Sequence, residues 1–90
     1  MNKIIVSDED RNILQRADVE CQSRANLIAF MIDKGMDISN DRFQEYQRSY
    51  EQAFLAFEQA KTDLQTKYLS NIKVSSWSLD YTTCELNYVD

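Results

Sequence analysis

Hydrophobic side chains recur at helical spacing in two long segments of the chain, one on each side of Gly35. The stripe in the first segment consists of Leu14, Ala17, Cys21, Ala25, Ile28 and Ile32. The stripe in the second segment consists of Phe43, Tyr46, Tyr50, Ala53, Phe57 and Ala60. Residues three and four positions apart lie on one face of a helix. Each segment therefore predicts an amphipathic helix that buries one side.

The two stripes are complementary when the segments run antiparallel. In that arrangement Leu14 faces Ala60, Ala25 faces Tyr50, and the pairs between them keep the same register. Small residues then lie opposite aromatic rings, which allows close packing without voids. The pattern predicts an antiparallel helical hairpin.

Capping signals place the two helices at about residues 8–34 and 41–69. The signals are Ser7 before the first helix, Gly35 after it, and Ser39 or Asn40 before the second. Ser and Asn side chains accept hydrogen bonds from the free amides of a first helical turn, and Gly adopts the left-handed conformation that often ends a helix. We expect residues 1–70 to form the hairpin.

Residues 71–90 differ in composition, being rich in β-branched and aromatic side chains and poor in helix formers. The alternation of their apolar positions slips twice, which is typical of a bulged strand or of a β-hairpin around Leu79–Thr83. No Asn-Gly or Asp-Gly pair specifies a tight turn, so we favour one long, bent strand. The short run Ile4–Val6 predicts either an edge strand that can pair with this arm or a hydrophobic staple. The predicted fold is mainly α: a two-helix antiparallel hairpin with a C-terminal β-strand arm, completed by oligomerisation or by docking of a partner.

More apolar residues are present than a helix pair can bury. Six of them lie outside the predicted interhelical contact: Ile13, Leu27, Phe30, Met31, Phe54 and Leu55. The arm either covers these positions within one molecule or forms an interface between molecules. We favour the interface, because buried aromatic side chains dominate interface energetics. Its predicted contact residues are Trp77, Leu79, Tyr81, Leu86, Tyr88, Phe30 and Phe54.

The composition excludes several kinds of catalytic, metal-binding and nucleic-acid-binding site. The 90 residues carry a formal net charge of −5, two cysteines and no histidine. Without histidine no Ser/His/Asp, Cys/His or Glu-x-x-His site can form. We therefore predict no catalytic, cofactor-binding or metal-binding residues, no cofactor and no small-molecule substrate. Scattered basic residues argue against direct nucleic-acid binding, and no segment has the roughly 20 apolar residues of a membrane span.

Three functional hypotheses follow. The leading one is a non-enzymatic protein–protein interaction or assembly protein of the cytoplasm, whose partner is another protein or a second copy of the chain. Its layout resembles, in architecture alone, small structural or accessory proteins of viruses and mobile elements.

The alternative is an acidic inhibitor or antitoxin-like protein that covers a basic site of an enzyme or a nucleic-acid-binding protein. Its charge would come from Asp8, Glu9, Asp10, Asp18 and Glu20. A third hypothesis, weakened by the lack of a Gly-Gly cleavage signal, treats residues 71–90 as a processed peptide.

Both cysteines are expected to be reduced thiols. Cys21 falls in the predicted helical contact, and Cys84 falls in the arm. Their separation matches no metal-ligand spacing, and the N-terminal segment has only three consecutive apolar residues, too few for a secretory signal peptide. Because Cys21 lies among the small residues of the first apolar stripe, we interpret it as a core thiol rather than a nucleophile.

Overall fold

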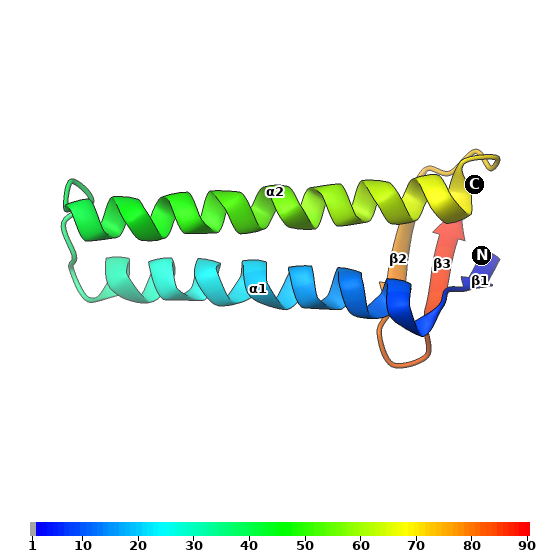
Figure 1. The fold of residues 1–90 in the computed structure, drawn as a ribbon, viewed down its shortest axis with the longest axis horizontal. Helices are drawn as coiled ribbons and strands as arrows, with labels where there is room; N and C mark the ends of the chain where they lie inside the picture. The colour runs from blue at the N-terminus through cyan, green and yellow to red at the C-terminus, as the bar shows by residue number, and fades with distance from the viewer. Residues whose placement is uncertain (1) are drawn as a thin grey trace.

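A computed structural model of the chain describes residues 2–90, so Met1, the first residue of the predicted hairpin unit, lies outside the described residues. It shows the predicted helical hairpin followed by a β-type arm (Figure 1). In chain order the elements are β1 (Asn2–Ile5), α1 (Asp8–Asp33), α2 (Asp41–Leu69), β2 (Ser76–Asp80) and β3 (Glu85–Val89).

The helix ends form as their capping residues predict. The Ser7 hydroxyl accepts a hydrogen bond from the Asp10 amide at 3.1 Å, and acidic residues occupy the first turn of α1. Gly35 follows the helix with a φ of 81°, the left-handed region that favours glycine. The Asn40 side chain accepts from the Arg42 amide at 2.8 Å and caps α2.

The arm is a β-hairpin, so the prediction of a single bent strand was wrong. β2 pairs antiparallel with β3, and β3 also pairs antiparallel with β1, which gives the strand order β1-β3-β2. Leu86 in the central strand lies between Ile4 of β1 and Leu79 of β2. The N-terminal run is thus an edge strand of a three-stranded sheet.

A side chain builds the turn between β2 and β3. The Asp80 carboxylate accepts hydrogen bonds from the amides of Thr82 (2.8 Å) and Thr83 (3.3 Å). The Cys84 amide donates to the Asp80 carbonyl oxygen at 2.9 Å, and Cys84 has a φ of 61°. Asp at the start of such a turn is common, but its left-handed position usually holds glycine. Cys84 takes that position here, so the turn forms without an Asn-Gly or Asp-Gly pair.

The sheet packs against one end of the hairpin, and the main core forms between them. In Figure 1, β2 and β3 run across the hairpin near the start of α1 and the end of α2, and β1 lies beyond them. The buried core residues come from both layers: Val6, Leu14, Leu64, Leu69, Cys84 and Leu86. The other half of the hairpin, toward the loop at residues 34–40, extends beyond the sheet.

The interhelical contact in α1 differs from prediction at its far end. Met31 is buried with 6% of its surface exposed, whereas Ile32 is 55% exposed. The reason is Arg24, a half-buried residue whose Nη1 donates to the Ser49 hydroxyl at 2.6 Å. Arg24 thus occupies a position in the interhelical contact. Spacings of four and then three residues from Arg24 place Ile28 and Met31 in the same contact. Choosing the apolar Ala25 instead shifted the predicted stripe by one residue.

Candidate protein-binding surface

The predicted contact residues of the arm lie against the hairpin of the same molecule. Trp77, Leu79, Tyr81 and Tyr88 are half-buried and pack on the main core. Leu86 has no exposed surface. The Trp77 indole also donates to Gln65 Oε1 of α2 at 3.2 Å. The arm therefore covers the hairpin end within one molecule, and Leu86 belongs to the intramolecular core.

Polar contacts attach the sheet turn to α1. The Tyr81 hydroxyl donates to Asp18 Oδ2 at 2.7 Å, and Arg11 Nη1 donates to the Tyr81 carbonyl oxygen at 2.8 Å. Burial, together with this hydrogen bond to a carboxylate, raises the pKa of Tyr81 well above its usual value. Tyr81 thus stays protonated and acts as a structural donor.

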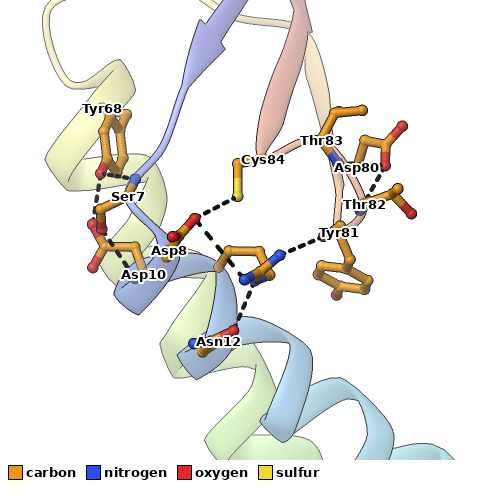
Figure 2. Close-up of polar contacts among 11 residues, drawn as sticks. Ser7, Asp8, Asp10, Asn12, Tyr68, Asp80, Tyr81, Thr82, Thr83 and Cys84 are labelled. Carbon is orange, nitrogen blue, oxygen red and sulfur yellow. Dashed lines mark hydrogen bonds and ion pairs between the residues drawn. The ribbon is translucent and has the colours of Figure 1, made fainter.

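A second set of contacts connects the start of α1 to the end of α2 (Figure 2). Asp10 Oδ2 accepts from the Tyr68 hydroxyl at 2.6 Å and from Lys67 Nζ at 2.8 Å. The Ser7 amide in turn donates to the Tyr68 hydroxyl at 3.1 Å. The hydrogen bonds from Lys67 and Tyr68 lower the pKa of Asp10, so the carboxylate stays ionised.

Both cysteines are free and buried. The Cys84 thiol lies 3.3 Å from Asp8 Oδ1 (Figure 2). Burial first, and then the hydrogen bond to this carboxylate, raise the pKa of Cys84. The raised pKa keeps the thiol protonated at neutral pH, so Cys84 serves as a hydrogen-bond donor to Asp8 at the junction of the sheet and α1.

The acidic residues near the start of α1 are largely used within the molecule. Asp8 and Asp10 make the contacts described above, and Asp18 accepts from both Tyr81 and Gln22. Glu20 pairs with Arg24 one turn along the helix. These carboxylates therefore hold the hairpin and the sheet together, which reduces the charge they can offer to a basic partner.

Exposed apolar side chains concentrate on the half of the hairpin that the sheet leaves uncovered. Among residues 2–90, eleven large hydrophobic residues are exposed, and seven of them fall between residues 27 and 55. They are Leu27, Phe30, Ile32, Ile38, Tyr46, Phe54 and Leu55. Phe30 is 58% exposed and Phe54 is 42% exposed. These two predicted contact residues are thus available to another molecule, and we call residues 27–55 the uncovered half.

A groove of about 500 Å³ runs between the helices, and all of its lining except Ala25 belongs to the uncovered half. Its lining carries no charged side chain: Ala25, Ile28, Ala29, Ile32, Ile38, Phe43, Gln47 and Tyr50. The Tyr50 ring also lies 6.2 Å from the Phe54 ring, which extends the apolar surface along α2. Sequence reasoning missed this groove, although Ala25 and Ala29 one turn apart were a signal of a close approach. The arrangement can bind an apolar surface.

Within residues 2–90 no group of His, Cys, Asp and Glu side chains is placed to hold a metal ion. No helix in that range is long and apolar enough to cross a membrane. No known protein family, curated protein or solved structure matches the chain.

Proposed function

We propose that this chain is a non-enzymatic interaction or assembly protein that binds another protein surface through its uncovered half. The single observation that carries the proposal is the concentration of exposed apolar side chains beyond the edge of the sheet. Exposed apolar side chains that gather in one region of a protein mark contact sites, because their burial is favourable.

The energetics support a contact surface. Fully burying one large apolar side chain contributes about 1.5–3 kcal/mol. Phe30, Phe54 and Leu55 are each exposed over 42–66% of their surface, so a partner that covers them recovers a large part of that energy. The sheet stabilises the opposite end of the hairpin, which leaves the uncovered half free to carry these residues.

The inhibitor hypothesis has less support. It requires free carboxylates near the start of α1, whereas Asp10 and Asp18 are engaged with Lys67 and Tyr81. We therefore place the contact on the uncovered half. A role in the cytoplasm, as an accessory protein of a virus or mobile element, is the more specific form of the proposal and rests on architecture alone.

A pair of double variants tests the proposal. Phe30→Asp with Phe54→Asp places two charges on the uncovered half, and Ser23→Asp with Thr66→Asp adds the same charge at exposed polar positions outside it. The free energy of unfolding of both variants should stay within about 0.5 kcal/mol of that of the natural protein, because substitutions at exposed positions change stability little.

Only the first variant should lose association, measured as the mass of the complexes recovered from the native host by size-exclusion chromatography with light scattering. Equal recovery of the same complexes with both variants would place the contact elsewhere and refute the proposal.

A further inference from the structure

The groove continues the face of the hairpin that carries the sheet. Arg11 and Asp18 of α1 both contact Tyr81 in the turn of the sheet. Asp18, Ala25 and Ile32 follow one another at intervals of seven residues, so they lie along one line of the helix. The sheet thus covers the first part of this line, and the groove occupies the rest.

The second helix shows the same division. Lys61 lines a hollow of about 490 Å³ beside Trp77 of β2, and Phe54 and Gln47 follow at intervals of seven residues toward the loop. β2 is an edge strand of the sheet that residues 2–90 form, and it is the strand nearest the hairpin loop (Figure 1). The molecule therefore has a step: two layers at one end and a single helical layer at the other.

We propose that a second copy of the chain fills this step. The inference rests on the proposed function and names the partner. The two copies are related by a two-fold axis through the groove, and the uncovered halves pack face to face with their loops pointing in opposite directions. The loop of each copy, residues 34–40, then lies against the free edge of β2 in the other.

The dimensions agree with this arrangement. The part of α2 before Phe57, the first of its residues to pack on the core shared with the sheet, covers residues 41–56. That length is about 24 Å at 1.5 Å per residue, and two helices side by side are about 20 Å wide. Each copy thus presents roughly 500 Å², and the pair buries about 1,000 Å², the lower limit for a specific interface. The sheet makes one end of the molecule about 10 Å thicker than the other, and a layer of helices is also about 10 Å thick. The helices of each copy can therefore fill the step of the other.

The charge distribution favours a second copy over a basic partner. Each copy has a net charge of −5, so two copies repel one another at long range and meet with least repulsion across an uncharged surface. The groove lining is uncharged, and its polar groups are the Gln47 amide and the Tyr50 hydroxyl. Ala25 and Ala29 have small side chains, so a helix of the second copy can approach α1 closely at these positions. A basic protein would require carboxylates in the groove, and a nucleic acid would require Lys or Arg side chains; the lining has neither.

Sedimentation velocity over a concentration series is the first test. The natural protein should form a dimer, Ala29→Glu should shift it to monomer with at least a tenfold weaker association, and Ser23→Glu should leave the dimer intact. Both positions are exposed on α1 and gain the same carboxylate, but Ser23 lies outside the groove lining. A natural protein that stays monomeric at all concentrations, or a dimer that Ala29→Glu leaves unchanged, overturns the inference.

Cross-linking tests the orientation of the copies. Within one chain, Ser39 and Ser76 lie far apart, because Ser76 and Glu58 line the same hollow and Glu58 is about 27 Å along α2 from Asn40. A short bismaleimide should link Ser39→Cys to Ser76→Cys only between copies, with the natural protein, whose cysteines are buried, as the background control. Linked dimers from Ser39→Cys alone would show a loop-to-loop arrangement and overturn the proposal.

The proposed function is judged separately. If the purified protein is monomeric but is recovered from its host in a complex that requires Phe30 and Phe54, the second copy is wrong and the contact surface is right. If neither association exists, both are wrong.

Discussion

Replacing Leu86 by Ala is the strongest test that the arm and the hairpin form one core. Leu86 has no exposed surface and lies in the central strand between Ile4 and Leu79. The change removes three carbon atoms, worth about 2.4 kcal/mol at ~0.8 kcal/mol for each methylene. The remaining cavity adds to this loss, so we expect a cost of about 3–4 kcal/mol. A chain of 90 residues has a total stability of roughly 5–13 kcal/mol, so the variant should be severely destabilised.

The assay is urea denaturation followed by far-ultraviolet circular dichroism, which reports chiefly on the helices, and by Trp77 fluorescence, which reports on the sheet. Both transitions should move together to lower urea. The matched control is Val89→Ala in the same strand, where 45% of the side chain is exposed, and it should cost under about 1 kcal/mol. If Leu86→Ala moves the fluorescence transition and leaves the helical transition unchanged, the sheet is not part of the hairpin core.

Three further changes test individual contacts. Asp10 has a lowered pKa when folded, so its stabilising effect is complete above about pH 3.8 and is lost as the pH falls through the folded value. Urea denaturation across this pH range should show that Asp10→Asn loses less stability on acidification than the natural protein does. Equal losses in both proteins would contradict the assignment. Asp80→Ala removes the acceptor of two turn amides and should cost about 1 kcal/mol in a thermal melt, whereas an unchanged melting temperature would show that the backbone sets the turn. Trp77→Phe loses the hydrogen bond to Gln65 and should cost about 0.5–1.5 kcal/mol while association by sedimentation is kept; loss of association without loss of stability would return the arm to the interface.

The helices could be predicted from the sequence because their signals are local. Ser7 and Asn40 satisfy free amides within three residues, and Gly35 adopts the conformation that other residues avoid. The apolar stripes then set the antiparallel register. The place of Arg24 in the interhelical contact could not be predicted, because its burial depends on Ser49, which is distant in sequence.

The sheet and the contact surface depend on longer-range packing. The arm's aromatic residues predicted an apolar face, but whether it meets the same chain or another is decided by tertiary contacts such as the Tyr81–Asp18 hydrogen bond. The hairpin turn depends on Cys84 in a position that glycine usually takes. The groove results from how far the sheet extends along the hairpin, and no local pattern specifies that distance.

Site-specific photo-crosslinking tests the central claim most directly. A benzophenone amino acid placed at Phe54, an aromatic position on the uncovered half, is compared in the native host with the same group at Lys73, an exposed residue between α2 and β2. We predict one discrete cross-linked species from position 54, containing either a second copy or one partner, and none from position 73. Cross-linking from position 73 alone, or the same products from both positions, would contradict the assignment of the uncovered half as the contact surface.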